Sequence, residues 1–209
     1  LRRLVELNQW ILSRRIAALI GDAILTPYYP DSINLGNRHG IALSILYPGE
    51  LGNEQSLRND LARVFRAAED VGKEIASELG VDYLGIDASL SPWGEESVVS
   101  AIERIYGIKF GGPGTLSAIY RLNKAIWDVS SQFRVTGFNE VMLPLAEDER
   151  LKARAREGLI TFSKLVKYVI TCVAGVDMVP ISSGQVALVK DLINDLHAIV
   201  SIKRRSVGL

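Results

Sequence analysis

Four acidic residues stand at positions where an α/β protein can carry a small-molecule site. Asp87 interrupts an apolar run, Glu147 and Asp148 follow a second one, and Asp177 stands within a third. Carboxylates that converge could bind Mg²⁺ or Ca²⁺, or could act as general acid and general base. We therefore predict all four as catalytic residues, and Asp87, Asp148 and Asp177 as metal ligands. A second interpretation stays open for Glu147 and Asp148, because any helix favours acidic residues at its start.

A glycine-rich segment, Phe110-Gly111-Gly112-Pro113-Gly114-Thr115, leads directly into a helical pattern. Glycines let the backbone approach a ligand closely, and the free amides at a helix start favour an anion. The segment lacks the lysine of a phosphate-binding loop and the spacing of a dinucleotide fingerprint. A tight turn in which Thr115 caps the helix is the alternative. For ligand binding the sequence predicts Ser89, Gly111, Gly112, Gly114 and Thr115.

Two further patterns carry less chemistry. Residues 134–138, Arg-Val-Thr-Gly-Phe, look like the short motif around the radical glycine of glycyl radical enzymes. Those enzymes also use an upstream cysteine, whereas the sole Cys172 lies downstream within an apolar helical stretch. Cys172 is therefore predicted to be a small buried side chain, and His197 a surface residue of a late helix.

The elements that must position these residues follow from hydrophobic periodicity. Apolar residues at helical spacing predict a long helix over 57–79, between strands over 41–47 and 81–90. The same reading continues along the chain, with helices over 98–105, 116–127, 162–173 and 189–200 and strands over 141–145 and 176–181. Strands that alternate with helices pair in parallel, with sites at their carboxyl ends. We predict one α/β domain over 1–209, with a parallel sheet or part of an α/β barrel and a long irregular excursion over 20–40.

Composition restricts the class of partner. Twenty-four basic residues balance twenty-four acidic ones, which argues against a nucleic-acid partner. The longest run without a charged residue, 178–189, is far shorter than the roughly 20 apolar residues of a membrane span. A single cysteine excludes an intrachain disulfide, so a cytoplasmic location is expected. The basic residues 203–205 are read as a solvated terminus, with an anion site as the alternative.

Four blocks occur in an order that resembles one protein family. They lie at 85–92, 110–115, 137–148 and 172–180, and Thr26-Pro27-Tyr28-Tyr29-Pro30 is similar to a further block. The resemblance, over roughly 20–209, is to domain of unknown function 711, also called uncharacterised protein family 0210. It implies a fold similar to the ten-stranded α/β barrel of the glycyl radical enzymes, without an established radical activity. Residues 182–184 depart from the Pro-Gly-Asp that relatives tend to carry there.

The same resemblance implies that the chain is the carboxyl-terminal part of a longer protein, which agrees with its lack of an initiating Met. Relatives are often encoded beside a small ACT-domain protein, which makes such a protein a possible partner. Two functions are expected: a small-molecule metabolic enzyme with an acidic, metal-binding pocket, or a non-catalytic metabolite-binding or regulatory protein that works with a small sensor. Apolar residues such as Trp93 and Trp127 could serve a homo-oligomer or the core.

Overall fold

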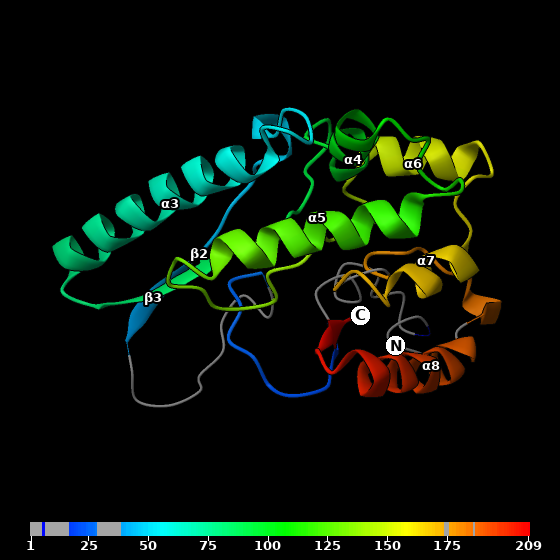
Figure 1. Ribbon diagram of the computed structural model, residues 1–209. Coiled ribbons are helices and arrows are strands. Elements are labelled where there is room, and N and C mark those ends of the chain that lie inside the picture. The colour runs from blue at the N-terminus through cyan, green and yellow to red at the C-terminus, as the bar shows by residue number, and fades with distance from the viewer. Residues whose placement is uncertain (1–5, 7–16, 29–38, 174–175, 186) are drawn as a thin grey trace.

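A long helix packs along a pair of parallel strands in the computed structural model, which describes residues 6, 17–28, 39–173, 176–185 and 187–209 (Figure 1). Strand β2 (Gly40–Ser44) leads through a 3-10 turn at Pro48–Glu50 into α3 (Leu57–Leu79), and β3 (Asp82–Asp87) follows. Strand β2 pairs with β3 from Gly40 beside Asp82 to Ser44 beside Asp87. The predicted strand, helix, strand unit with parallel pairing is thus confirmed.

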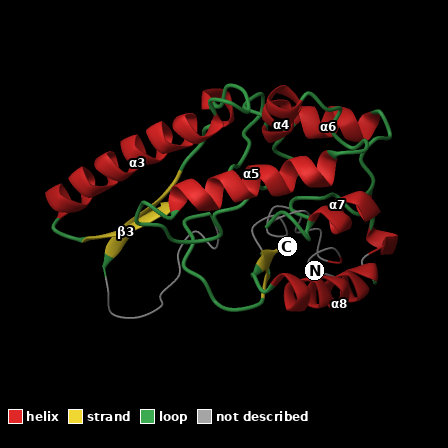
Figure 2. Cartoon of the chain, viewed as in Figure 1, coloured by secondary structure: helices red, strands yellow, loops and turns green. Residues whose placement is uncertain are grey.

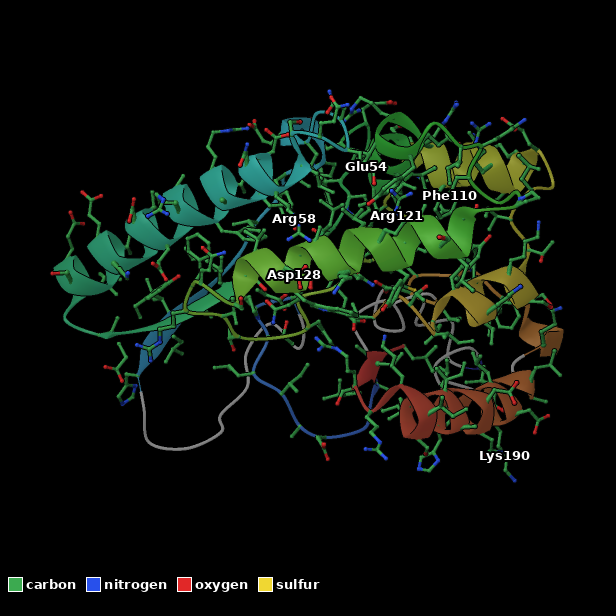
Figure 3. The ribbon with its side chains drawn as sticks, viewed as in Figure 1. Glu54, Arg58, Phe110, Arg121, Asp128 and Lys190 are labelled. Carbon is green, nitrogen blue, oxygen red and sulfur yellow. The ribbon has the colours of Figure 1, made fainter. Side chains whose placement is uncertain are left out.

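Helix α5 (Thr115–Ser130) lies beside α3 (Figures 1 and 3). The guanidinium of Arg58 on α3 ion-pairs with the Asp128 carboxylate on α5 at 2.7 Å. Below these surface groups, buried apolar side chains of α3, β3, α4 and α5 form one continuous core. Within it the Phe65 ring meets the rings of Tyr47 and Phe133 edge to face. The apolar helical stripes seen in the sequence therefore face a common core.

Of the four other helices, apolar spacing predicted three, with different bounds, and the one at 149–156 was indicated only by the acidic residues before it. They are α4 (Val98–Tyr106), α6 (Glu149–Arg156), α7 (Phe162–Tyr168) and α8 (Leu188–Lys203). Helix α7 ends well before residue 173, where the apolar spacing had placed its end. The amides of Thr171 and Cys172 both bond to the Tyr168 carbonyl in a turn. The Lys203 ammonium donates a hydrogen bond to the Cys172 carbonyl at 2.7 Å. This carbonyl therefore has a donor without a further helical turn.

Two predicted strands are replaced by irregular segments with isolated contacts. Leu90 bridges to Val141 in parallel, and the Leu145 amide donates to the Asp177 carbonyl at 3.0 Å. Residues 141–145 and 176–181 form no regular ladder with the described part of the chain. Both segments contain a proline, Pro144 and Pro180, which has no amide hydrogen to donate. Strands over 141–145 and 176–181 were therefore wrong predictions.

Among the described residues, six α-helices accompany two small sheets (Figure 2). The second sheet pairs β1 (Leu19–Ile20) with β4 (Val207–Gly208) in antiparallel fashion, which the sequence did not predict. The chain is thus mixed α/β, as expected, and a ten-stranded barrel is not confirmed. No described helix combines the length and apolar character needed to cross a membrane. The single domain over 1–209 stays a prediction.

Candidate functional site

Asp87, the last residue of β3, has a wholly buried carboxylate with five hydrogen-bond donors. Its Oδ1 accepts from the Ser89 amide at 3.1 Å, the Ser89 hydroxyl at 2.6 Å and the Asn139 amide at 3.0 Å. Its Oδ2 accepts from the Thr26 hydroxyl and the Phe138 amide, both at 2.9 Å. The carboxylate therefore fastens two segments that are distant in sequence to the end of β3.

Ser89, predicted as a ligand contact, belongs to the same buried network. Besides donating to Asp87, its hydroxyl oxygen accepts from the Glu140 amide at 3.1 Å. Its carbonyl accepts from the Tyr28 hydroxyl at 3.2 Å. Burial, and then the Asp87 charge, raise the pKa of Tyr28 well above its ordinary value, so the phenol stays neutral and can donate. A ligand-binding role for Ser89 stays a prediction.

The segment that looked like a radical-glycine motif runs alongside β3. The Ile86 amide donates to the Arg134 carbonyl at 3.0 Å, and the Thr136 amide donates to the Ile86 carbonyl at 2.9 Å. Gly137 follows with φ +73°, against the Asp87 carboxylate. These contacts give the motif a packing role at the end of the strand.

Asp148 caps two helices at once from a fully buried position. Its Oδ1 accepts from the Leu151 amide at 2.9 Å, which is the N-cap bond of α6, and from the Ser97 hydroxyl at 2.6 Å. Its Oδ2 accepts from the Val99 amide at 3.2 Å in the first turn of α4. Ser97 is itself the N-cap of α4 through the Ser100 amide at 2.9 Å. The helix-start interpretation of Asp148 is therefore the one that its contacts support.

The glycine-rich segment closes on itself at the start of α5. The Thr115 hydroxyl accepts from the Gly111 amide and donates to the Gly112 carbonyl, each at 2.9 Å, and the Gly112 amide bonds to the Lys109 carbonyl. Gly114 is the N-cap of α5, with φ +90°. These bonds favour a tight turn, although Gly114 and not Thr115 is the N-cap, so the capping role expected of Thr115 was wrong. An anion site on the three glycines and Thr115 stays a prediction.

Glu147 and Asp177 are the two predicted acidic residues that the fold brings together. The backbone bond between the Leu145 amide and the Asp177 carbonyl joins their two segments. Burial, followed by the Glu147 charge, raises the pKa of Asp177 to about 7, although the Met178 amide donates to this carboxylate. Burial also raises the pKa of Glu147 above its usual range. Near neutral pH the Asp177 carboxyl group can therefore both release and accept a proton.

An open groove of about 380 Å³ is lined in part by residues that neighbour Glu147 and Asp177 in the chain. The groove is formed by the segments on either side of the pair and by one face of α6, and its lining residues are Leu145, Ala146, Lys152, Ala155, Arg156 and Pro180. Leu145 and Ala146 directly precede Glu147, and Pro180 lies three residues after Asp177. We refer to it as the α6 groove. It offers apolar walls and two cationic groups.

The four predicted acidic residues thus lie at three separate places: Asp87, Asp148, and the pair of Glu147 and Asp177. Asp87 lies where Ile86 bridges to Val135, and Asp148 lies farther along the same two segments, where it bridges to Gly94. Within the described part of the chain, no three His, Cys, Asp or Glu side chains come together as a metal site. The oxygens of Asp87 and Asp148 already accept hydrogen bonds from protein donors. Metal binding by Asp87, Asp148 and Asp177 therefore gains no support from their contacts and stays a prediction.

A buried ion cluster was missed by sequence reasoning. The Glu140 carboxylate, 1% exposed, accepts from the Lys203 ammonium at 2.6 Å, and Lys203 is only 7% exposed. The Arg205 guanidinium pairs with the other Glu140 oxygen at 2.6 Å and lies over the Trp127 ring. The solvated-terminus interpretation of residues 203–205 was therefore wrong for Lys203. The sequence does contain a hint of this pair, because Glu140 directly precedes the apolar residues 141–143. A glutamate that is buried with such a segment needs a cationic partner from elsewhere in the chain.

The remaining reactive side chains agree with their predicted places. Cys172 is fully buried, and His197 is exposed on α8. Asn123 on α5 is fully buried and links two segments. Its amide oxygen accepts from the Val141 amide at 2.7 Å, and its amide nitrogen donates to the Thr171 carbonyl. Cys172 and Asn123 therefore contribute to the core.

Comparison with known sequences gives a match over most of the chain. Residues 52–209 match the family model described as Uncharacterised ACR (DUF711). The chain is also similar to curated relatives that carry the name UPF0210 protein. The one from Sulfurisphaera tokodaii is 30% identical over 140 residues, which cover 63% of this chain and 32% of the relative.

Two other relatives extend the comparison. The UPF0210 protein of Methanopyrus kandleri is 35% identical over 121 residues, 56% of this chain and 27% of the relative. That of Desulfovibrio desulfuricans is 27% identical over 178 residues, 83% of this chain and 38% of the relative. The chain therefore spans about a third of the length of the curated relatives that it matches.

Proposed function

The chain belongs to the DUF711 family of uncharacterised proteins, and from this premise and the site geometry we propose that it carries part of the active site of a small-molecule enzyme. Glu147 and Asp177 are the general acid and base of this proposal. The observation that carries it is the approach of the two carboxyl groups, in which burial and then the Glu147 charge raise the pKa of Asp177 to about 7, while Leu145, Ala146 and Pro180 of the same two segments line the α6 groove. A carboxyl group with this pKa can both donate and accept a proton at neutral pH.

The roles follow from the electrostatics of the pair. Two carboxylates that influence each other do not ionise independently, so the first proton lost leaves a charge that holds back the second. In the half-protonated state, the protonated Asp177 can donate to a leaving or carbonyl oxygen of the substrate. The Glu147 carboxylate can accept a proton from a carbon atom of the substrate, or from a water molecule that attacks the substrate. The pair then returns to its starting state by exchanging protons with solvent.

Asp87 and Asp148 support this site as positioning residues in the proposal. Asp148 starts α6, whose residues 152, 155 and 156 line the groove. Asp87 holds the turn at 137–139, which directly precedes the extended segment leading to Glu147. Metal binding by Asp87, Asp148 or Asp177 is not needed for proton transfer by the pair, and the proposal does not depend on it.

The test is turnover by the full chain and by a matched pair of variants. Wild-type protein is incubated with a panel of oxo acids, hydroxy acids and phosphorylated metabolites, and products are followed by mass spectrometry. Asp177→Asn removes the titrating group, and Asp195→Asn changes an exposed carboxylate on α8 as the control. The proposal expects a product that wild type and D195N form and that D177N forms at least about a hundredfold more slowly, the scale of general acid–base catalysis.

The alternative function is a non-catalytic metabolite-binding protein that works with an ACT-domain partner. Saturable binding of a panel compound, without product after extended incubation, would support this alternative and overturn the enzyme proposal. Product formation that D177N leaves unchanged would overturn the roles given to the acidic pair. The experiment should also be run on the longer protein of a relative, because this chain spans about a third of the relatives' length.

A further inference from the structure

The α6 groove has a composition suited to a particular class of ligand. Four of its lining residues, Leu145, Ala146, Ala155 and Pro180, are apolar, and the other two are cationic. Its volume of about 380 Å³ lies within the range of small-molecule sites. No carboxylate is among the six lining residues, although Glu147 and Asp177 stand beside them in the chain. The groove therefore combines an apolar wall with positive charge.

The two cations differ in how far they are already neutralised. The Lys152 ammonium pairs with the Glu149 carboxylate one turn earlier on α6. Arg156, exposed at the end of the same helix, makes no close ion pair with a described residue, and its charge acts on the Glu149 carboxylate only at longer range. Its neighbour Arg154 is instead buried in ion pairs with Glu103 and Glu157. Arg156 is thus the cation that is available to a ligand, and Lys152 can join it by leaving Glu149.

We propose that the α6 groove binds a small organic anion whose charged group pairs with Arg156 and Lys152 and whose hydrocarbon part packs on the apolar wall. This inference rests on the proposed function and names the substrate class of that site. A guanidinium presents two parallel N–H donors that match the two oxygens of a carboxylate or phosphate. A neutral ligand would leave both cations unused, and a cationic ligand would be repelled by them. The anion would then lie beside the acidic pair that transfers the proton.

Binding to the full chain is measured with four probes of equal chain length: butyrate, butyl phosphate, butylammonium and 1-butanol. Chemical-shift changes in the ¹⁵N NMR spectrum give both the dissociation constants and the location. We expect butyrate or butyl phosphate to bind at least about tenfold more tightly than butylammonium or butanol, with shifts at residues 145–146, 152–156 and 180. Preference for butyrate or for butyl phosphate distinguishes a carboxylate from a phosphate ligand.

Variants separate the groove from other surface charges. Arg156→Gln should weaken anion binding about tenfold or more, and Lys152→Gln by a smaller factor. Lys190→Gln removes an exposed cation of α8, labelled in Figure 3, and should leave binding unchanged. Arg156→Lys keeps the charge and loses the paired donors, so it should fall between wild type and R156Q. Equal affinity for butylammonium, or anion binding that R156Q does not change, would overturn the inference.

The outcomes also separate this inference from the acid–base proposal. Anion binding that depends on Arg156, together with no turnover of any panel compound, supports the groove and overturns the enzyme. Turnover that is lost in D177N, with anion binding indifferent to R156Q, supports the acidic pair and overturns the groove as the anion site.

Discussion

Asp87 and Gly137 lie so close that a Cβ atom at residue 137 would be 1.9 Å from Asp87 Oδ2. The amides of Phe138 and Asn139, which follow directly, bond to the same carboxylate. Glycine is thus required twice at this position, because φ is +73° and because the carboxylate occupies the space of a side chain. The buried carboxylate and the glycine turn form one structural unit at the end of β3.

Gly137→Ala should therefore destabilise the protein more than its backbone angle alone predicts. Gly158→Ala is a matched control, because Gly158 has the same φ of +73° and a Cβ atom at residue 158 would meet nothing within 4 Å. We expect G158A to cost about 1 to 2 kcal/mol, the cost of a left-handed conformation for a residue with a Cβ. G137A should cost at least about 2 kcal/mol more, measured by urea unfolding. Equal losses in the two variants would contradict the steric role of Asp87.

Asp148→Ala should lower the free energy of unfolding by roughly 2 to 4 kcal/mol, because it leaves the Leu151 and Val99 amides without their acceptor in a buried site. Ser97→Ala removes one hydroxyl from the same cluster and should cost about 1 kcal/mol. Thermal unfolding followed by circular dichroism measures both. Thr161→Ala is the control for the loss of a single cap, because Thr161 is the N-cap of the short helix α7 and its bond to the Lys164 amide is exposed. A loss in D148A no larger than in T161A would contradict the double-cap role.

The extent to which sequence predicts this fold depends on how local each signal is. Helices α3, α4 and α5 were predicted nearly in full, because their buried residues repeat at 3.6-residue spacing within one segment. Residues 141–145 and 176–181 were predicted as strands from short apolar runs. Whether such runs form a ladder depends on partners elsewhere in the chain, and the prolines in both limited that pairing.

Among the site residues, too, roles that depend on neighbours in the chain could be predicted, and roles that depend on distant partners could not. The helix-start role of Asp148 was open to prediction, because it depends on the three residues that follow it. The partners of Asp87 and Glu140 were not, because Thr26 lies 61 residues from Asp87 and Lys203 lies 63 residues from Glu140. Contacts over such separations are set by the tertiary fold. The sequence shows only that a charged residue stands in an apolar run and needs a partner.

Breaking the buried pair between Glu140 and Lys203 should be strongly destabilising. Lys203→Met removes the cation and leaves the Glu140 carboxylate buried with Arg205 alone, for an expected loss of about 3 kcal/mol or more. Replacing both partners, as in E140L/K203M, should recover part of this loss, because no buried charge is left unpaired and Arg205, which also loses Glu140, is 41% exposed. Urea unfolding of the two variants measures the difference. The pair of Arg63 and Glu50, whose side chains are both more than half exposed, is the control, and R63M should cost less than about 1 kcal/mol.

Asp177 should make stability fall as the pH rises from about 4 to about 7. Its pKa is raised from 3.8 to about 7 by burial and then by the Glu147 charge, so in this range the folded state holds a proton that the unfolded state has released. The stabilisation is fully present below pH 4 and is lost as the pH rises through 7. Asp177→Asn removes the titration, so the difference in unfolding free energy between wild type and D177N should change over this window and level off above about pH 8. Glu147→Gln should lower the pKa of Asp177 and move the window to lower pH, and a difference independent of pH would contradict the raised pKa.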